Sequence, residues 1–334
     1  MTDDNTPRKA SLMRRMFRLA LSVATIAIGS SAMAGEIYVS NEKGNTVTVL
    51  DSTSLAKVAE IKVGNRPRGI LLSKDQKLLY VCVSDDDTIE VVDLATRQIV
   101  GTLPSGPDPE VIALSPDGKT LYAANEDDNM VTVVDIETRT AISEIPVGVE
   151  PEGMAVSHDG KWIVSTSETT NMAHFIDADT HEIVDNVLVD QRPRVAEFTD
   201  DDAEVWVTSE IGGTVAVIDA KTRTIKKKIG FAVPGVPAEA LQPVGVRVTR
   251  DRKWAFVALG PANRVAVIDA KTYEVEKYLL VGQRVWQLVL GPDEKLLYTT
   301  NGASNDISVI DVAKLQTIKS VPVGAYPWGL AVRG

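Results

Sequence analysis

The stretch LYVCVSDDDTIEVVD, residues 79–93, joins two short apolar segments through a polar turn and ends the second segment in an aspartate. A segment of this second kind recurs seven times, as VTVLD, IEVVD, VTVVD, AHFID, VAVID, VAVID and ISVID. The terminal aspartates are Asp51, Asp93, Asp135, Asp177, Asp219, Asp269 and Asp311. Five of the six intervals between them are 42 residues long and the remaining one is 50. A period in this range indicates an array of repeated structural units.

Each repeat contains four short segments that are rich in β-branched residues, and it shows almost no helical pattern. At the start of the chain these segments read EIYVSN, VTVLD, KVAEIKV and RGILLS. Four strands in a repeat of 42 residues are typical of one propeller blade. The sequence therefore predicts an all-β fold over residues 35–334, a single seven-bladed β-propeller domain with four antiparallel strands per blade.

The two ends of this domain are out of phase with each other in a way that predicts ring closure. The domain begins with a second strand, EIYVSN, and it finishes with a strand of the innermost type, PWGLAV. We expect the N- and C-terminal strands to share one blade, which closes the ring and leaves no free sheet edge between the first and last repeats.

The most regular motifs favour a structural role. SPDGK and SHDGK lie between the first and second strands of their repeats, where Asp and Gly suit a tight hairpin turn. Each terminal aspartate is followed by a turn such as DLATRQ or DIETRT. We expect its carboxylate to cap the backbone amides of that turn.

Residues 1–34 have the composition of a secretory signal peptide. Five positive side chains precede or flank an apolar stretch from about Leu19 to Ile28, and small residues follow up to Ala34. The apolar stretch is too short to span a membrane. We therefore predict cleavage after Ala34 and a periplasmic protein, exported by the general pathway or, because RRMF meets part of the pattern, by the twin-arginine pathway.

Charge and cysteine content exclude several classes of function. Removing residues 1–34 takes away five positive and two negative charges, so the net charge changes from −11 to −14. This balance disfavours nucleic acid and anionic lipid as partners. Cys82 is the only cysteine, which excludes an internal disulfide, a C-x-x-C-H heme site and any multi-cysteine metal site. We expect a monomer with no membrane span in the mature chain.

One structural position, which we call the proline slot, differs most from repeat to repeat. It is seen first in NRPRGILLS, residues 65–73, where a loop turns into the innermost strand. The residues before the slot proline are Arg66, Asp108, Glu150, Arg192, Gln242, Arg284 and Tyr326. The residues after it are Arg68, Glu110, Glu152, Arg194, Val244, Trp286 and Trp328, and Val285 replaces the proline itself in the sixth slot.

A second set of residues follows the second strands, which end at the same mouth of the predicted channel. It consists of Glu42, Asp85, Glu126, Glu168 and Glu210, before the pattern changes to Pro261 and Gly302. One interpretation is a solvated ring of ion pairs, each worth under about 1 kcal/mol. The other is a binding site, because Trp286, Tyr326 and Trp328 come from adjacent blades and have little reason to line a wet rim unless they contact something.

The binding interpretation gives a definite set of candidate residues. The ligand- or partner-binding candidates are Arg66, Arg68, Glu110, Glu152, Arg192, Arg194, Arg284, Trp286, Tyr326 and Trp328, with a secondary rim of Glu42, Glu126, Glu168, Glu210 and His174. Arginines beside aromatic rings suit a planar or anionic ligand, and an acidic partner surface is equally compatible. The acidic arc is also compatible with calcium, but no EF-hand-like loop supports that, and we predict no metal site.

Sequence signals for catalysis are weak. No G-x-S-x-G or H-E-x-x-H motif occurs, and we assign no catalytic residue. His174 occupies a strand position that holds Thr, Glu, Ala or Ser in the other repeats, so a hydrogen-bonded histidine between blades is the expected role. The long interval contains an insertion at residues 231–241, which is a lid, a docking edge or a tolerated insertion.

Several of these segments resemble known propeller families. The segments LYVCVSDDDTIEVVD, LYAANEDDNMVTVVD and IPVGVEPEGMAVSHDGK resemble the YVTN family of β-propeller repeats, over residues 36–333. More narrowly, the chain resembles the periplasmic propellers associated with pyrroloquinoline quinone (PQQ)-dependent catabolism. That resemblance is carried by SNEKGNTVTVLD, SETTNMAHFID, VDQRPRVAEF, SEIGGTVAVID, LGPANRVAVIDAKTYEV and VGQRVWQL.

The narrower resemblance implies a biological system rather than a reaction. Members of that family are seven-repeat proteins encoded beside transport and quinoprotein alcohol oxidation genes, and they bring no established catalytic residues. The resemblance implies a non-enzymatic periplasmic binding or scaffold protein, with PQQ as a ligand or as the cofactor of a partner. The implied partner is a periplasmic quinoprotein dehydrogenase or a transport component. The chain lacks the tryptophan-docking motifs and adjacent-cysteine disulfide of quinoprotein dehydrogenases.

Two alternatives remain open from the sequence. Lactonases and lyases also use propeller mouths, and alcohol oxidation can yield lactones. In an enzyme of that kind, Glu152, Glu168, Arg194 and His174 would supply the acid, base and oxyanion-stabilising groups. The other alternative is a purely structural interaction module with neither ligand nor turnover.

Overall fold

The computed structural model describes residues 1–2 and 35–334. The predicted signal peptide and its cleavage site after Ala34 therefore lie almost wholly outside the described residues, and the structure does not test them. Within the described part of the chain, no helix is both long enough and apolar enough to cross a membrane.

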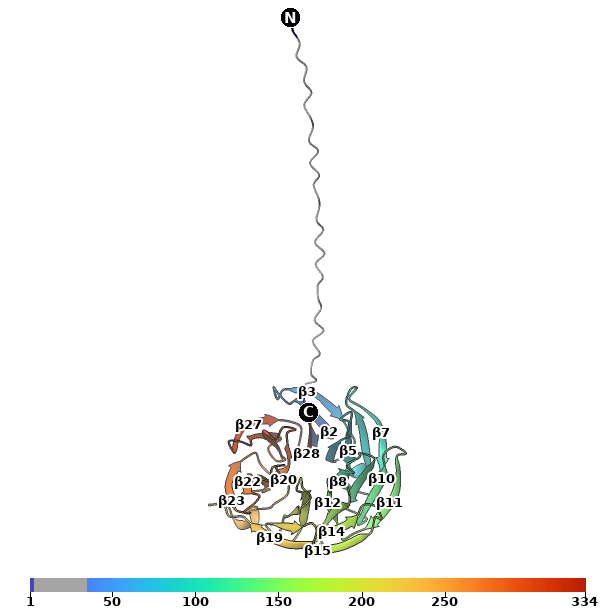
Figure 1. The fold of residues 1–334 in the computed structure, drawn as a ribbon, viewed down its shortest axis with the longest axis vertical. Coiled ribbons are helices and arrows are strands. Elements are labelled where there is room, and N and C mark those ends of the chain that lie inside the picture. Colours follow the sequence, from blue (N-terminus) through green and yellow to red (C-terminus); the bar gives the residue numbers. More distant parts are fainter. Residues whose placement is uncertain (3–34) are drawn as a thin grey trace. The chain divides into compact units, whose positions relative to one another are not determined.

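The chain from residue 35 onward forms seven four-stranded antiparallel sheets arranged in a ring (Figure 1), as the repeats predict. Blade 1 contains β28 (Pro327–Arg333), β1 (Glu36–Asn41), β2 (Thr46–Asp51) and β3 (Lys57–Lys62). Blade 2 contains β4 (Pro67–Leu72), β5 (Leu78–Val83), β6 (Thr88–Asp93) and β7 (Gln98–Pro104). Blade 3 contains β8 (Pro109–Leu114), β9 (Thr120–Asn125), β10 (Met130–Asp135) and β11 (Thr140–Pro146). Blade 4 contains β12 (Pro151–Val156), β13 (Trp162–Ser167), β14 (Met172–Asp177) and β15 (Ile183–Leu188).

The remaining three blades follow the same order from the channel outward. Blade 5 contains β16 (Pro193–Phe198), β17 (Glu204–Ser209), β18 (Thr214–Asp219) and β19 (Thr224–Gly230). Blade 6 contains β20 (Val246–Val248), β21 (Trp254–Ala258), β22 (Arg264–Asp269) and β23 (Val275–Leu280). Blade 7 contains β24 (Val285–Leu290), β25 (Leu296–Asn301), β26 (Asp306–Asp311) and β27 (Gln316–Pro322). Two 3₁₀ turns, Ser84–Asp86 and Ala238–Ala240, are the only helical elements in the described residues.

Blade 1 closes the ring with strands from both ends of the domain. The C-terminal strand β28 pairs antiparallel with β1, so that Tyr38 lies opposite Ala331 and Glu36 opposite Arg333. The predicted closure is therefore confirmed. Because β1 also pairs with β2, the second strand of blade 1 is paired on both sides, like the second strand of each other blade.

The core lies between neighbouring blades, where the apolar faces of adjacent sheets meet. One apolar cluster, for example, joins Trp206 and Val217 of blade 5 to Val257 and Ala266 of blade 6. The second and third strands of the blades are almost fully buried, whereas the outermost strands alternate mainly between exposed and half-buried residues. Side chains alternate between two faces in every strand, and an exposed face remains only at the periphery of the ring.

The terminal aspartates act as caps, as predicted. Asp93 illustrates the arrangement: its Oδ1 accepts hydrogen bonds from the backbone N–H of Thr96 at 2.7 Å and from the Thr96 hydroxyl at 2.9 Å. These hydrogen bonds lower the pKa of the Asp93 carboxyl below its usual value. The carboxylates of the aspartates that end the other third strands accept the same kind of bond from backbone amides.

A backbone feature that the sequence analysis missed turns the chain toward the channel at the proline slot. The residue before the slot proline is left-handed in six of the seven repeats, for example Arg66 with φ 53°. Its N–H donates to the side-chain oxygen of an Asn or Asp 21 residues earlier, as from Arg66 to Asn45 Oδ1 at 3.1 Å. These anchor residues are Asn45, Asp87, Asn129, Asn171, Asn263 and Asn305.

The fifth repeat is the exception to this anchor. Its anchor position holds Gly213, which has no side-chain acceptor, and the insertion 231–241 follows in the same repeat. Phe231, Val233 and Val236 pack against the apolar cluster between blades 5 and 6. The backbone N–H of Ala232 donates to the hydroxyl of Tyr278 on the outermost strand β23, so the insertion packs toward the outside of the ring.

The innermost strands are held together by buried hydroxyl groups. In blade 4 the Thr166 hydroxyl accepts from the N–H of Gly153 at 2.9 Å and donates to the carbonyl of Arg194 in blade 5 at 2.7 Å. Ser40, Thr208 and Thr300 make equivalent links between their blades. The close approach leaves no space for a side chain, because a Cβ on Gly153 would lie 2.0 Å from the Arg194 carbonyl oxygen.

We predict that Gly153→Ala destabilises the protein by about 1–3 kcal/mol, because the added methyl group forces β12 and β16 apart. Chemical denaturation of the mature protein measures this loss. Gly230→Ala is the matched control, since a Cβ at Gly230 meets no atom within 4 Å. Equal stability of the two variants would contradict the close packing of the innermost strands.

Candidate functional site

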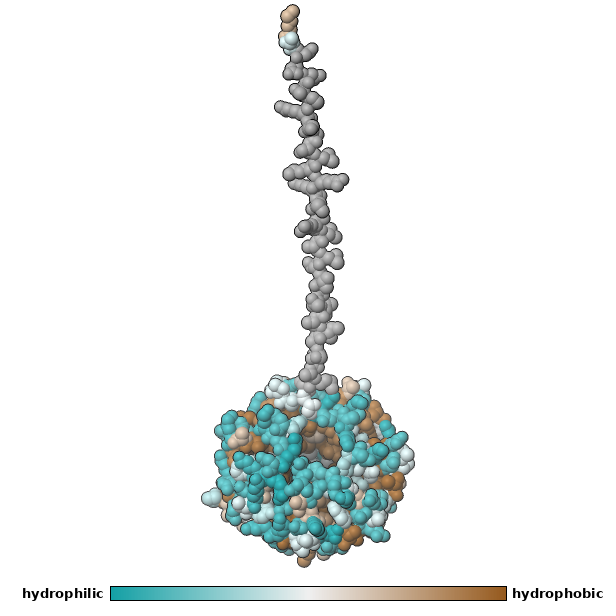
Figure 2. Space-filling model, viewed as in Figure 1, coloured by the Kyte–Doolittle hydropathy of each residue, from teal (hydrophilic) through white to brown (hydrophobic). Residues whose placement is uncertain are grey.

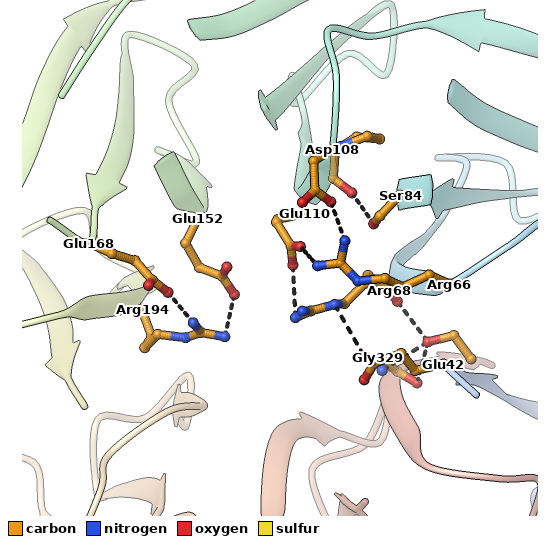
Figure 3. A network of polar contacts seen from close by, with 12 residues as sticks. Glu42, Arg66, Arg68, Ser84, Asp108, Glu110, Glu152, Glu168, Arg194 and Gly329 are labelled. Atoms are coloured by element: carbon orange, nitrogen blue, oxygen red, sulfur yellow. Dashed lines mark hydrogen bonds and ion pairs between the residues drawn. The ribbon is translucent and has the colours of Figure 1, made fainter. Parts of the chain in front are cut away.

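The seven residues that follow the proline slots lie around one mouth of the central channel. Six of them are the second residue of an innermost strand, and Val244 precedes β20. Four of them carry charge: Arg68 on β4, Glu110 on β8, Glu152 on β12 and Arg194 on β16. Figure 3 shows these side chains in two groups that face each other, with Glu110 and Glu152 as neighbours between them. Sequence analysis predicted this convergence, and the structure brings the residues together.

The first group is the Glu110 cluster, built around one carboxylate that has no exposed surface (Figure 3). Glu110 Oε1 accepts from Arg66 at 2.8 Å, and Oε2 lies 3.0 Å from Arg68. Arg66 also contacts Asp108 at 2.8 Å, while Arg68 lies 3.9 Å from Glu42. Two guanidinium groups are therefore fixed in position by three carboxylates.

The second group is the Arg194 cluster, built around one guanidinium that is 4% exposed. Arg194 forms an ion pair with Glu152 at 2.8 Å and donates to Glu168, and its Nε lies 3.8 Å from Glu210. Two more arginines complete this cluster from outside. Arg192 contacts Glu168 at 2.8 Å and Glu210 at 3.2 Å, and Arg284 contacts Glu210 at 2.9 Å.

Burial changes how much these ion pairs contribute to stability. The interpretation as a solvated ring of weak surface pairs is wrong for the centre of both clusters, because Glu110, Glu152, Glu168, Arg194 and Glu210 are all buried. Buried ion pairs gain little net stability over an apolar core, but the loss of one partner leaves an uncompensated charge that costs about 3–5 kcal/mol. The mouth is therefore a rigid, mutually dependent network.

The crowding of carboxylates raises the pKa of several of them. Burial, followed by the neighbouring Glu152, Glu126 and Asp108 charges, raises the pKa of Glu110 in spite of Arg68. Burial also raises the pKa of Glu168 to about 7, against the opposing effect of Arg194. Burial and the same carboxylates raise the pKa of Glu126. The network therefore binds protons more readily than isolated carboxylates do.

One member of the predicted rim lies elsewhere. The residue that follows β5 in the position of Glu126 is Ser84, not Asp85: the N–H of Ser84 donates to the Arg66 carbonyl, as that of Glu126 donates to the Asp108 carbonyl. The Ser84 hydroxyl donates to the carbonyl of Pro109 at 2.7 Å. Asp85 lies outside this ring and its side chain is 56% exposed.

The aromatic residues of the mouth contact the protein's own cations. The Arg284 guanidinium lies 4.1 Å from the Trp286 ring centre, and Lys43 Nζ lies 4.0 Å from that of Tyr326. Trp286 and Tyr326 pack edge to face. Trp328 is 1% exposed and lies under Arg68, so it is part of the packing rather than an open wall. The predicted aromatic wall is thus largely filled from within.

Acids outnumber bases at the mouth. The carboxylates are Glu42, Asp108, Glu110, Glu126, Glu152, Glu168 and Glu210, and the arginines are Arg66, Arg68, Arg192, Arg194 and Arg284. Every one of these arginines has at least one carboxylate partner. Glu126 has no ion pair among the described residues, although Asp108 and Glu110 lie close enough for the three carboxylates to share a cation.

His174 has the structural role that its strand position predicts. Its Nδ1 faces Asn186 Oδ1 at 2.5 Å, and its Nε2 accepts from the backbone N–H of Gly148 at 3.0 Å. The acceptor role of Nε2 places the proton on Nδ1, so the ring is neutral. Burial lowers the pKa of His174, in agreement with this state. His174 therefore does not belong to the mouth network.

Behind the mouth, the channel contains a cavity of about 350 Å³. Its lining comes from the innermost strands and combines apolar side chains, such as Ile70, Val111, Met154 and Leu288, with a similar area of polar atoms. None of the charged mouth residues lines it. The space-filling view is hydrophilic over most of one face and shows hydrophobic residues within its central hollow (Figure 2).

Comparisons with known proteins place this fold among propellers of several functions. A family model described as Cytochrome D1 heme domain matches residues 81–196, a minority of the chain. No curated protein matches the chain.

Solved structures match over most of the chain. Hydrazine synthase of Kuenenia stuttgartiensis is 22% identical with a TM-score of 0.77, covering 83% of this chain and 92% of that one. A dihydro-heme d1 dehydrogenase, NirN, solved in complex with DHE, is 15% identical with a TM-score of 0.68, covering 89% and 74%. A putative 6-phosphogluconolactonase from Bacteroides fragilis is 17% identical with a TM-score of 0.76, covering 91% and 99%. At these identities the likeness shows the fold alone.

The family description names a heme, but no histidine or cysteine at the charged mouth offers heme iron a free donor atom. Heme iron needs an axial His, Met, Cys or Tyr ligand with a free donor atom. Both ring nitrogens of His174 are engaged, and Cys82 is fully buried. His158, at the edge of the cavity, has Nδ1 at 2.9 Å from Asp202 and Nε2 at 4.0 Å from Asp200. We therefore derive no heme chemistry for this chain.

We predict that Arg194→Ala lowers the free energy of unfolding by about 3–5 kcal/mol, because it leaves buried carboxylates without their cation. The loss is expected to be larger at pH 8 than at pH 5.5, since Glu168 with a pKa of about 7 can take up a proton at the lower pH. Denaturant titrations at the two pH values measure both effects.

Arg192→Ala is the control for this experiment. Its side chain is 45% exposed and contacts two of the same glutamates, so its loss should cost less than about 1 kcal/mol. Equal effects of the two substitutions would show that burial of Arg194 does not control the network.

Proposed function

We propose that this chain is a non-enzymatic periplasmic propeller that binds a partner protein at its channel mouth and serves PQQ-dependent alcohol catabolism. The propeller fold and the resemblance of the repeats to the PQQ-associated family support the biological system. A periplasmic quinoprotein dehydrogenase is the expected partner, and a transport component is the second. The observation that carries the proposal is the charge state of the mouth.

The arginines of the mouth are not free to bind an anionic ligand. Each is already engaged by carboxylates, and carboxylates exceed arginines by seven to five. A ligand with carboxylates, such as PQQ itself, would have to displace a buried glutamate or accept its repulsion. Basic side chains of a partner protein would instead meet the negative potential of the excess carboxylates at the mouth.

The exposed parts of the network are suited to such a contact. Arg192 and Asp85 have side chains that are 45% and 56% exposed. Glu126 lies between the two clusters without an ion pair among the described residues and with a raised pKa. The rigid, buried pairs below would hold these groups in place, so that a partner meets a surface that needs little rearrangement.

We predict that the mature protein binds a PQQ-dependent alcohol dehydrogenase from its own host, and that Glu126→Gln weakens this binding about 3- to 10-fold. The substitution removes negative charge without breaking an ion pair, and charges at an interface mainly set the association rate and its salt dependence. Biolayer interferometry at low and high salt measures both quantities.

The control is Glu274→Gln, which removes an exposed acid outside the mouth, in the turn between β22 and β23. Its binding should equal that of the unchanged protein. Tight binding of free PQQ without binding of the dehydrogenase would overturn the partner proposal, and so would normal growth on alcohols of a strain that lacks this protein.

A second candidate function is hydrolysis of a lactone formed by alcohol oxidation, and one observation favours it. Burial raises the pKa of Glu168 to about 7, near the value of an effective general base, and Arg194 lies beside it as a source of oxyanion stabilisation. Glu152 completes the set. His174, which sequence analysis included, is engaged elsewhere. A putative 6-phosphogluconolactonase has the same fold, which supports considering this chemistry.

If this second function holds, lactone turnover should rise as pH increases from 6 to 8, because Glu168 accepts a proton only after losing its own. Glu168→Gln should abolish turnover, whereas Glu274→Gln should leave it unchanged. A pH-stat assay with simple γ- and δ-lactones measures the rate. Absence of turnover at every pH removes this candidate and leaves the partner proposal intact.

A further inference from the structure

The cavity behind the mouth carries a second inference, separate from the charged network. Its lining residues come from all seven innermost strands, starting just below the charged ring and ending at the opposite face. Near the ring they include Gly69, Val111 and Gly329, and at the far end His158 and Arg247. The side chain of His158 is 52% exposed, so the cavity approaches solvent on the face away from the mouth.

Most of the residues that line the cavity are apolar, and polar atoms contribute a similar area between their side chains. Ile70, Met154, Val195, Leu288 and Leu330 contribute most of its middle section. Its volume of about 350 Å³ falls in the range of pockets that bind small molecules. Apolar burial of a ligand in such a cavity is worth about 25 cal/mol per Å² of area removed from water.

Gln287 contributes an uncharged polar side chain to the lining of the cavity. Gln287 lies on β24 at the second position after the slot, where the other repeats have Gly or Val. It is 7% exposed, and it lines the cavity. Its backbone N–H donates to the Thr300 hydroxyl, but its side-chain amide has no hydrogen-bond partner among the described residues. The amide atoms remain accessible from the cavity, so a ligand there can form hydrogen bonds with them.

The charged groups at the edge of the cavity are already neutralised. Glu197 Oε2 lies 3.1 Å from Arg247, which also donates to the Val246 carbonyl at 2.7 Å. His158 is held by Asp202. No lining residue therefore offers an unpaired charge to a ligand, and an ionic group would enter the cavity without a counterion.

From these observations we propose that the central cavity is a binding site for an uncharged, mostly aliphatic small molecule with one hydroxyl or carbonyl group. The apolar wall takes the aliphatic part, and the Gln287 amide exchanges hydrogen bonds with the polar head. An amide can both donate and accept, so it suits an alcohol as well as an aldehyde or a neutral amide. The site does not depend on a partner at the mouth, because no mouth carboxylate lines it.

The test uses the mature protein with methyl-labelled methionine and three probes of equal chain length: 1-hexanol, hexanamide and hexanoate. We expect 1-hexanol and hexanamide to shift the Met154 methyl resonance in a saturable manner. Hexanoate is expected to bind at least 10-fold more weakly, since the cavity offers its carboxylate no free cation. Gln287→Leu should weaken the neutral probes about 3- to 10-fold, the effect of one lost hydrogen bond.

Two further variants make the outcome decisive. Gln191→Leu removes an exposed glutamine from a slot loop and should leave all affinities unchanged. Ile70→Trp fills the cavity from β4 and should abolish binding, with circular dichroism and the remaining methyl resonances showing that the variant is folded. The proposal is overturned if the neutral probes cause no saturable shift, if Gln287→Leu binds them as tightly as the unchanged protein, or if hexanoate binds as well as 1-hexanol.

Discussion

The hydrogen bond from the residue before each slot proline to an Asn or Asp 21 residues earlier determines how the chain enters the channel. In Arg66 and its counterparts the backbone is left-handed, which costs energy for a side chain other than Gly. The anchor stabilises that turn, and the proline after it fixes the direction of the innermost strand. Because six repeats share the device, their slot residues reach the mouth in equivalent positions.

This geometry forces charged residues into a crowded ring, and the ring is stable only because opposite charges are paired within it. Glu110 and Arg194 are the buried centres of the two clusters, and each contacts several partners of the other sign. Burial, together with the neighbouring carboxylates, then raises the pKa values of Glu126 and Glu168. Buried ion pairs make the centre of this surface rigid, whereas carboxylates at its edge can gain or lose a proton.

Residues one or two positions apart on the innermost strands belong to different parts of the channel, the charged mouth and the cavity behind it. Arg68, Glu110 and Glu152 belong to the charged ring, whereas Val111 and Met154, one or two positions further, belong to the cavity wall. The two regions can therefore differ in what they bind. Gln287 contributes an uncharged polar side chain to the described wall of the cavity.

The sequence alone determined the architecture, because the spacing of the terminal aspartates and the phase of the two ends permit only a closed ring of seven blades. It also identified the slot residues, since a repeat converts sequence position into spatial position. Burial and pairing were decided by tertiary structure: Trp328 and Glu110 are covered by neighbours from other blades, and Ser84 rather than Asp85 occupies the rim. These outcomes depend on the distance between adjacent innermost strands, which no single repeat encodes.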